Sequence, residues 1–477
     1  MTERVVLVSG HFNILHPGHL RLLRYAKECG DRLVVAVESD RIAGNAAHVP
    51  EILRLEGVQS NNWVNEAFIA DEPITEVISR IRPDIVVKGK EHELRFNPEL
   101  AVLESYGGRL LFSSGEMVFS SLDLIRKEFK NIDTKSITLP NEYLARHGVT
   151  KERLTYLLQQ FSRLKVCVIG DLIIDEYITC HPLGMSQEDT TIVVMPVDTT
   201  RFIGGAGIVA AHAAGLGASV RFISVTGNDT VREFAIAGFA ESGVEARLLV
   251  DESRPTTLKQ RYRSKGKSLL RVSHLHQGAI SVSLQEQMLQ ELEEVIEEID
   301  LLVFSDFNYG CLPQALVERI VAIAAARGVV LAADSQSSSQ VGDISRFRGM
   351  DLLTPTEREA RISTRNREDG LVVLAEQLRQ QASANNILLK LGEEGLLIHA
   401  GDGKADEWLT DRVDALNSIP KDVAGAGDSL LITSAMTMAS RGNIWEAAFL
   451  GSLAAAVQVG RVGNTPIQSQ ELLRELI

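Results

Sequence analysis

Residues 422–429, Asp422-Val423-Ala424-Gly425-Ala426-Gly427-Asp428-Ser429, form a glycine-rich turn that leads into an apolar segment of small residues, 430–439. Glycines let the backbone pass close to a ligand, and a helix that begins near Gly427 leaves its first N–H groups unpaired. Such groups suit an anionic phosphate. Asp428 falls in the first helical turn, where a carboxylate can take the proton from an attacking alcohol. An aspartate here can equally be a simple helix cap, so the interpretation needs support from the rest of the chain.

The bulk composition limits the class of protein. The chain has 477 residues, too many for one ordinary core, so two or more domains are expected. With 45% hydrophobic and 23% charged residues it is typical of soluble globular proteins. A formal net charge of −14 argues against nucleic-acid and anionic membrane partners. The four cysteines lack paired or metal-like spacing, and neither a signal peptide nor a membrane-length apolar run is present. We therefore expect a cytoplasmic protein with no nucleic-acid or membrane partner.

The first part of the chain alternates between strands and helices. Strands are expected at 4–9, 32–39, 85–87 and near 110–112, and helices after residue 16 and over 74–81. This order predicts a small parallel sheet covered by helices, a Rossmann-like α/β domain over residues 1–130. Residues 131–150 do not continue this alternation of strands and helices, and they contain Pro140 and Gly148, so they are the expected linker.

Residues 151–477 are expected to form a second α/β domain. Apolar residues at i, i+3, i+4 and i+7 predict an amphipathic first helix (Leu154, Leu157, Leu158, Phe161). Strands follow at 166–169, 221–225, 301–304, 329–333, 352–353 and 387–391, an order typical of a doubly wound sheet. Two segments, 191–202 and 256–272, alternate β-branched and polar residues. They predict a small second sheet that acts as a lid.

A histidine pair follows the first predicted strand. His16 and His19 flank Pro17-Gly18 at the expected start of a helix. Two imidazoles beside a helix N-terminus can hold triphosphate oxygens and stabilise charge as pyrophosphate leaves. The alternative is that these histidines are ordinary polar packing residues.

In this context the segment resembles the nucleotidyltransferases of the HxGH superfamily, particularly the cytidylyltransferase-like branch. That resemblance implies catalytic roles for His16, His19 and Lys88. It also implies nucleotide-binding roles for Gly10, His16, Gly18, His19, Arg54, Lys88, Ser120 and Ser121. The branch usually has Gly-x-Phe-Asp before the histidines, whereas this chain has Gly10-His11-Phe12-Asn13, which keeps a hydrogen-bonding side chain without its charge.

The glycine-rich turn resembles the ribokinase (PfkB) family of sugar kinases, and the resemblance spans roughly residues 164 to 470. It implies that Asp428 is the catalytic base and also contacts the substrate, as do Asp171, Asp175, Gly204 and Gly205. Nucleotide contacts are implied for Lys390, Gly392, Gly395, Gly425, Ala426 and Gly427. Glu359 is expected to help organise Mg²⁺, with Thr356 in place of the family's usual asparagine.

Among these relatives the chain is most similar to the bifunctional heptose kinase/adenylyltransferases. They pair the same two domains with the kinase first, whereas here the transferase is first. Where those kinases have basic residues, this chain has the segments Gly184-Met185-Ser186-Gln187-Glu188 and Asp306-Phe307-Asn308-Tyr309-Gly310. Ile208 stands where sugar kinases commonly have a sugar-binding asparagine. Because phosphosugar binding usually needs Arg or Lys, the identity of the sugar stays open.

The sequence therefore predicts a bifunctional enzyme. ATP would phosphorylate a sugar or sugar phosphate with Mg²⁺, and a nucleotidyl group from ATP or CTP would pass to a sugar 1-phosphate. The alternative is a nucleotidyltransferase whose kinase-like domain only binds and dimerises, which Ile208 and Tyr309 favour and Asp428 opposes. A homodimer is expected, because the lid strands have exposed edges and an apolar face (Ile192, Val194, Val197).

Overall fold

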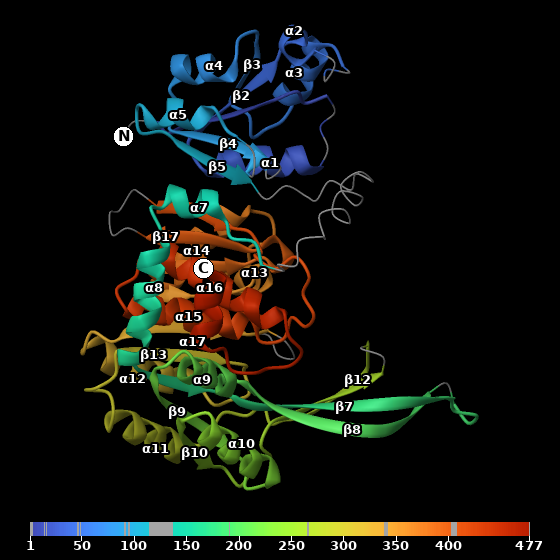
Figure 1. The fold of residues 1–477 in the computed structure, drawn as a ribbon, viewed down its shortest axis with the longest axis vertical. Coiled ribbons are helices and arrows are strands. Elements are labelled where there is room, and N and C mark those ends of the chain that lie inside the picture. Colours follow the sequence, from blue (N-terminus) through green and yellow to red (C-terminus); the bar gives the residue numbers. More distant parts are fainter. Residues whose placement is uncertain are drawn as a thin grey trace. The chain divides into compact units, whose positions relative to one another are not determined.

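The computed structural model describes residues 3–13, 15, 17–44, 47, 49–89, 92–93, 96–113, 137–189, 191–264, 267–337, 342–401 and 408–476. The chain forms two compact units (Figure 1). Unit 1 comprises Met1–Lys135 together with Arg367–Glu376 and Thr410–Arg412. Unit 2 comprises Ser136–Asn366, Gln377–Leu409 and Val413–Ile477.

Unit 1 contains a five-stranded parallel sheet in the order β3-β2-β1-β4-β5. Its strands are β1 (Val5–Gly10), β2 (Arg32–Glu38), β3 (Glu66–Ala70), β4 (Ile85–Gly89) and β5 (Arg109–Ser113). Its helices are α1 (Pro17–Glu28), α2 (Asp40–Ala43), α3 (Glu51–Gln59), α4 (Ile74–Ile81) and α5 (Glu99–Glu104). The expected strands and the helix over 74–81 are confirmed. Strand β3 was not predicted, because it is a five-residue edge strand with a half-buried pattern.

The sheet of unit 1 is buried on both faces, which explains its continuous apolar strand sequences. Leu7, Val34 and Val86 pack with α4 and α5 in one cluster, while the alternate residues Val6, Val35 and Val87 are also fully buried. Each such side chain stabilises the fold by about 1.5–3 kcal/mol. Because all five strands run parallel, their carboxyl ends share one edge. Gly10 and Lys88 lie at that edge, at the carboxyl ends of β1 and β4.

Unit 2 contains a nine-stranded sheet in the order β10-β9-β6-β13-β14-β15-β16-β17-β18. It is parallel from β10 to β16, and β17 pairs antiparallel with β16. The strands are β6 (Lys165–Gly170), β9 (Ser219–Thr226), β10 (Val244–Val250), β13 (Leu301–Asp306), β14 (Val330–Ser335), β15 (Leu352–Leu353), β16 (Asn386–Lys390), β17 (Leu396–Gly401) and β18 (Trp408–Val413). The predicted parallel α/β sheet is confirmed.

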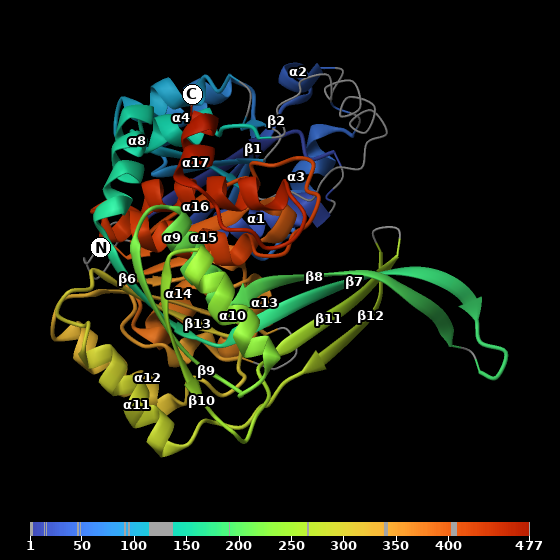
Figure 2. The ribbon, with the colours of Figure 1, turned by 60° about the horizontal axis from the view of Figure 1, so that its bottom comes forward.

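Helices cover both faces of this sheet (Figure 2). The helices of unit 2 are α7 (Asn141–Arg146), α8 (Lys151–Gln160), α9 (Ala206–Gly215), α10 (Thr230–Glu241), α11 (Val282–Glu293), α12 (Gln314–Ala325), α13 (Glu357–Thr364), α15 (Ala426–Ala439), α16 (Ile444–Val459) and α17 (Ser469–Leu476). Helix α14 (Leu371–Ala382) begins in the segment assigned to unit 1 and ends in unit 2. Ala332 of β14 and Leu388 of β16 belong to the core cluster that includes α15. Asp334 and Lys390 lie two residues further along each strand, so they extend this face toward α15.

The predicted linker, 131–150, is described only from residue 137 onward. There it contributes α7, and Tyr143 and Leu144 are buried in the core cluster of unit 2. The Tyr143 hydroxyl donates a hydrogen bond of 2.8 Å to the Trp445 carbonyl. This stretch is therefore folded as part of unit 2, and the domain boundaries at 130 and 150 stay predictions.

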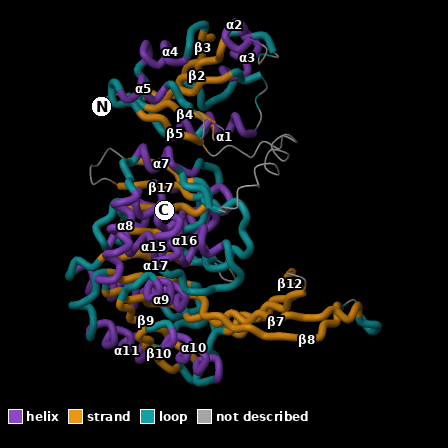
Figure 3. Tube along the Cα trace, viewed as in Figure 1, coloured by secondary structure: helices purple, strands orange, loops and turns teal. Residues whose placement is uncertain are grey.

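A separate four-stranded sheet, the lid, has the order β12-β11-β7-β8. Its strands are β7 (Leu172–Met185), β8 (Ile192–Gly205), β11 (Leu258–Ser264) and β12 (Lys267–His274), and β7 and β8 extend beyond the body of unit 2 as a long arm (Figure 3). The strands expected within 191–202 and 256–272 are confirmed. Strand β7 was not predicted, because only Asp171 separates its apolar start from β6, so no turn signal divides the two.

Candidate active sites

The start of α15 exposes backbone N–H groups beside a lysine. Gly425 is the N-cap residue with φ 76°, and a Cβ atom there would lie 2.3 Å from Asn464 Oδ1. A Cβ atom on Gly427 would lie 3.2 Å from Lys390 Nζ. Within the described part of the chain, the N–H groups of Gly427 and Asp428 make no hydrogen bond. The bare backbone and the ammonium group together suit a phosphate.

Asp428 is buried in the first turn of α15, with 6% of its surface exposed. The N-cap position of α15 is occupied by Gly425, and the Asp428 Oδ1 atom accepts a hydrogen bond of 3.1 Å from Gln336 Nε2. This contact joins Asp428 to the end of β14, which a simple helix cap does not require. Burial, and next the nearby Asp334 carboxylate, raise the pKa of Asp428 to about 7, while Lys390 and Lys259 act in the opposite direction. A carboxylate with this pKa suits a general base near neutral pH.

A buried ion pair supports this site from the sheet. Lys390 Nζ lies 2.7 Å from Asp334 Oδ2, and both side chains are largely buried. Burial opposes the charge on Lys390, but the carboxylates of Asp334 and Glu359 raise its pKa. The Oδ1 atom of Asp334 is buried and has no hydrogen-bond partner among the described residues. That unsatisfied oxygen indicates room for a further donor or cation.

Glu359, the expected magnesium residue, forms a capping box with Thr356 at the start of α13. Its Oε2 atom accepts from Thr356 N–H at 2.8 Å, and its Oε1 atom accepts from Ser337 N–H at 2.9 Å. This explains why threonine can replace the family's asparagine, since both residues cap helices well. No cluster of three ligating side chains occurs in the described ranges. Each Glu359 oxygen keeps one lone pair, which fits a Mg²⁺ ion that retains most of its waters.

The expected substrate residues gather where the lid meets the sheet. A Cβ atom on Gly204 would lie 2.4 Å from Asp175 Oδ2, so the glycine leaves room for this carboxylate. Arg261 Nη2 of β11 lies 3.4 Å from Asp175 Oδ1. Burial raises the pKa of Asp175, and Arg261 and Lys259 oppose that shift. Gly205 is the N-cap of α9 with φ 59°, a conformation that favours glycine.

The Asp171 carboxylate contacts the backbone of the loop after β13. Its carboxylate accepts hydrogen bonds from the N–H groups of Phe307, Tyr309 and Cys311, at 2.8, 3.3 and 3.2 Å. Burial, and then the neighbouring Asp306, raise its pKa to about 6. Asp171 therefore holds the loop after β13, and a contact with substrate stays a prediction.

Two departures from the sugar-kinase pattern lie in the core. Ile208 and Tyr309 have exposed fractions of 1% and 2%. Lys259 Nζ of β11 lies 5.1 Å from the ring centroid of Tyr309 and 5.4 Å from that of Phe307. The aromatic rings of this loop thus support a lysine from the lid.

The sequence did not single out Asp334, Gln336, Lys259 or Arg261. Asp334 and Gln336 follow a predicted parallel strand, and the carboxyl ends of such strands commonly bear ligands. Lys259 and Arg261 stand two residues apart in a segment predicted to be a strand, so they lie on one face. The signals existed, but only the fold relates them to Asp428.

In unit 1 the described part of the histidine motif has the expected local structure. Gly10 ends β1, and α1 begins at Pro17, a favoured first helical residue that precedes Gly18. The ring of His19 lies 5.2 Å from that of Phe12. His16, Ser120 and Ser121 lie outside the described residues. The histidine pair and the serine pair therefore stay predictions.

The two predicted cations of unit 1 are engaged within that unit. Arg54 is 1% exposed and donates to Val49 O, His11 O and Asp40 Oδ1 at 2.7, 2.6 and 2.6 Å. Lys88 Nζ lies 2.8 Å from Glu99 Oε1 in a largely buried pair. These contacts give Arg54 a role in holding the loop after β1 and Lys88 a role in anchoring α5. Their nucleotide contacts stay predictions.

Comparison with known proteins assigns each unit to a class. Residues 163–470 match the family described as pfkB family carbohydrate kinase, and residues 7–130 match the family described as cytidylyltransferase-like. Every helix in the described ranges is too short or too polar to traverse a lipid bilayer.

Curated relatives and solved structures agree with these matches. The chain is 29% identical over 320 residues to the bifunctional protein HldE of Desulfatibacillum aliphaticivorans, covering 66% of this chain and 64% of the relative. It is 30% identical over 314 residues to HldE of Helicobacter hepaticus, covering 65% and 63%. The chain thus spans somewhat less than two thirds of the length of these relatives. A carbohydrate kinase from Agrobacterium tumefaciens has the same fold, with a TM-score of 0.51 and 21% identity over 66% of this chain and 97% of its own.

Proposed function

Because the chain belongs to the pfkB family of carbohydrate kinases, we propose that unit 2 phosphorylates a sugar or sugar phosphate with ATP. We propose further that unit 1 transfers a nucleotidyl group from ATP or CTP to a sugar 1-phosphate and releases pyrophosphate. The observation that carries the proposal is the position of Asp428. It lies at the start of α15, beside unpaired N–H groups and two lysines, with a pKa near neutrality.

In the kinase reaction Asp428 accepts the proton of the attacking hydroxyl. The N–H groups of Gly427 and Asp428 and the ammonium group of Lys390 bind and orient the phosphates. When bound, magnesium–ATP supplies the phosphoryl group. Glu359 and Asp334 would hold the waters around the metal. Asp175 and the backbone at Gly204 and Gly205 would orient the acceptor.

In the transferase reaction the phosphate of the acceptor is already an anion, so no base is needed. The helix start at Pro17 and the side chains of His16 and His19 would hold the triphosphate. The nucleoside triphosphate, when bound, supplies the nucleotidyl group. Lys88 would have to exchange its Glu99 partner for phosphate, and Ser120 and Ser121 would contact the nucleotide.

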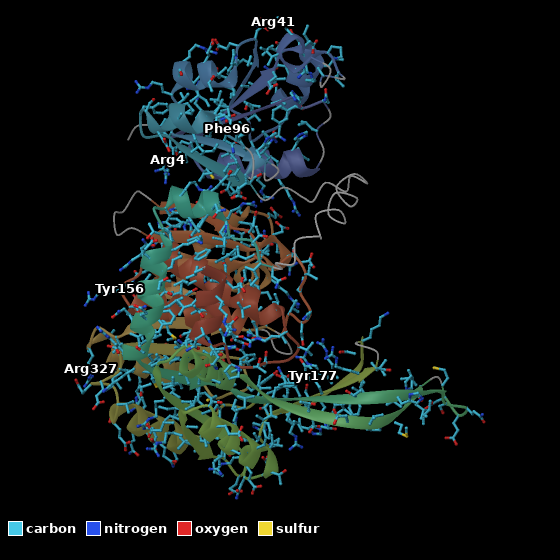
Figure 4. All side chains as sticks on the ribbon, in the orientation of Figure 1. Arg4, Arg41, Phe96, Tyr156, Tyr177 and Arg327 are labelled. Atoms are coloured by element: carbon cyan, nitrogen blue, oxygen red, sulfur yellow. The ribbon has the colours of Figure 1, made fainter. Side chains whose placement is uncertain are left out.

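A row of cations on β11 favours a phosphorylated acceptor. Lys259, Arg261 and Arg263 alternate along the strand and so share one face, which also carries Asp175 and Tyr177 of β7. The guanidinium groups of Arg261 and Arg263 lie 5.2 and 5.0 Å from the ring of Tyr177, near the base of the arm (Figure 4). These cations compensate for the basic residues missing from 184–188 and 306–310. We therefore favour a heptose-like sugar phosphate over a neutral sugar as the acceptor of the kinase reaction.

A second candidate function is a binding and dimerisation module in unit 2. The buried positions of Ile208 and Tyr309 favour it, because neither side chain can contact a sugar hydroxyl from the core. Against it stands the burial of Asp428. A buried carboxylate destabilises the fold and needs another reason to be present.

The lid favours a homodimer. Large apolar side chains are exposed along the arm at Leu183, Met185, Ile192, Val193, Met195 and Val197. Strands β8 and β12 are the edges of the lid. A second copy of the chain that packs on the arm would cover both the apolar side chains and an edge.

The test uses the purified full chain in two assays. The first measures ADP formation from ATP with heptoses, hexoses and their phosphates. The second measures pyrophosphate release from ATP or CTP with sugar 1-phosphates. ADP formation that depends on a phosphosugar would support the kinase. Pyrophosphate release without sugar-dependent ADP formation across the panel would favour the binding module.

A further inference from the structure

Gln336 follows the last residue of β14 and reaches the carboxylate of Asp428. Its Nε2 atom donates a hydrogen bond of 3.1 Å to Asp428 Oδ1. Only the NH₂ end of an amide can donate, so a carboxylate partner fixes its orientation. No described residue donates to the other Asp428 oxygen, Oδ2.

The backbone of Gln336 is held on both sides. Its N–H donates to Asp306 O at 2.8 Å, and its carbonyl accepts from Asn308 Nδ2 at 3.1 Å. Asn308 has φ 61°, an uncommon conformation for a residue with a side chain. The next residue, Ser337, donates its N–H to Glu359. The Gln336 amide therefore projects from a segment whose backbone is held by hydrogen bonds on both sides.

We propose that Gln336 is a positioning residue that holds Asp428 by its Oδ1 atom and presents the Oδ2 atom to the acceptor hydroxyl. The inference rests on the kinase reaction proposed above. A restrained carboxylate needs no reorganisation before it accepts the proton, and a donated hydrogen bond favours its ionised form.

The ionised form of Asp428 needs this support. The acids Asp334 of β14 and Asp175 of β7 disfavour its charge, while Lys390 at the end of β16 and Lys259 of β11 favour it. Burial outweighs the lysines. Loss of the Gln336 amide should therefore raise the pKa of Asp428 further and leave less of the base ionised at neutral pH.

The experiment compares pH profiles of sugar-dependent ADP formation for the wild type, Gln336→Ala and Gln336→Lys. We expect Gln336→Ala to lose roughly tenfold in kcat at pH 7, to recover at alkaline pH, and to keep its KM for ATP. Gln336→Lys keeps a donor and adds positive charge, so its acid limb should move to lower pH. The matched control is Gln285→Ala on α11, which removes an amide that donates to Ile280 O at 3.0 Å. Its profile should equal that of the wild type.

A second measurement does not depend on activity. Thermal unfolding of Gln336→Ala, Asp428→Ala and the double variant should show non-additive effects, because the two side chains share one hydrogen bond. The inference would be overturned if the pH profiles of the active wild type and Gln336→Ala had the same acid limb. It would also be overturned if the effects of Gln336→Ala and Asp428→Ala on unfolding were additive in the double variant. A wild type without sugar-dependent ADP formation would instead refute the kinase proposal, and the unfolding cycle would still decide whether Gln336 holds Asp428.

Discussion

Asp428 is the residue whose proposed catalytic role most clearly lowers the stability of the folded chain. An unfolded aspartate has a pKa near 3.8, whereas burial raises that of Asp428 to about 7. Between these values the folded chain binds a proton that the unfolded chain does not, so stability falls as the pH rises. Above pH 7 the buried charge costs on the order of a few kcal/mol. The proposed base thus opposes folding under the conditions in which it acts.

Asp428→Asn is therefore predicted to make the protein more stable at pH 8 and no more stable at pH 4. The change keeps the volume and an oxygen that can accept from Gln336, while it removes the ionisable group. Melting temperatures of the two proteins across pH 4 to 8 measure the difference. Equal melting temperatures throughout, or a gap that widens toward acid pH, would contradict the raised pKa.

For single residues, the sequence indicated which side chains to consider more often than it indicated which groups those side chains contact. Asp428 was singled out from its glycine-rich turn together with the resemblance of residues 164 to 470 to the ribokinase family. Arg54 and Lys88 were chosen because they match positions of the cytidylyltransferase-like branch, but their partners, His11 O and Glu99, lie 43 and 11 residues away in the chain. Only tertiary structure decides whether such a cation faces a ligand or a carboxylate. For the same reason the sequence did not show that the Asp171 carboxylate accepts hydrogen bonds from the loop after β13, and its contact with substrate stays a prediction.

Among the elements, the two main sheets were predictable because parallel strands buried on both faces give continuous apolar runs. The lid was only partly predictable. Strands β8, β11 and β12 fall in the segments that were recognised from their alternation, whereas β7 continues the apolar run of β6. The short edge strand β3 gave no pattern either. A strand of few residues with little buried surface, or an absent turn signal, leaves too little pattern for a prediction.

The exposed arm leads to a prediction about the lid as an element. Ile192 and Val197 are 48% and 65% exposed on β8. If a second copy covers them, Ile192→Lys with Val197→Glu should convert the dimer to a monomer by burying unpaired charge. Light scattering at micromolar concentration measures the state. Val282→Lys is the matched control, since Val282 is 71% exposed on α11. A wild-type monomer, or a dimer that survives the double change, would contradict the proposal.

For the whole molecule, the division into two units bears on how the two reactions depend on each other. The kinase cluster of Asp428, Lys390 and Asp334 lies in unit 2, and the histidine motif lies in unit 1. The two clusters share no residue. Substitution effects at sites without common partners usually add, and strong non-additivity is confined to residues that act as one unit.

We therefore predict that the two activities separate by mutation. Asp428→Asn should lower sugar-dependent ADP formation by orders of magnitude, because the base is lost, and leave pyrophosphate release from a supplied sugar 1-phosphate almost unchanged. His19→Ala should lower pyrophosphate release on the order of 10² or more, because a donor to the triphosphate is lost, and leave ADP formation almost unchanged. Both assays are run on each purified variant, with melting temperature as the check on folding. If folded Asp428→Asn lost pyrophosphate release as well, the reactions would share one composite site, and the division between the units would be wrong.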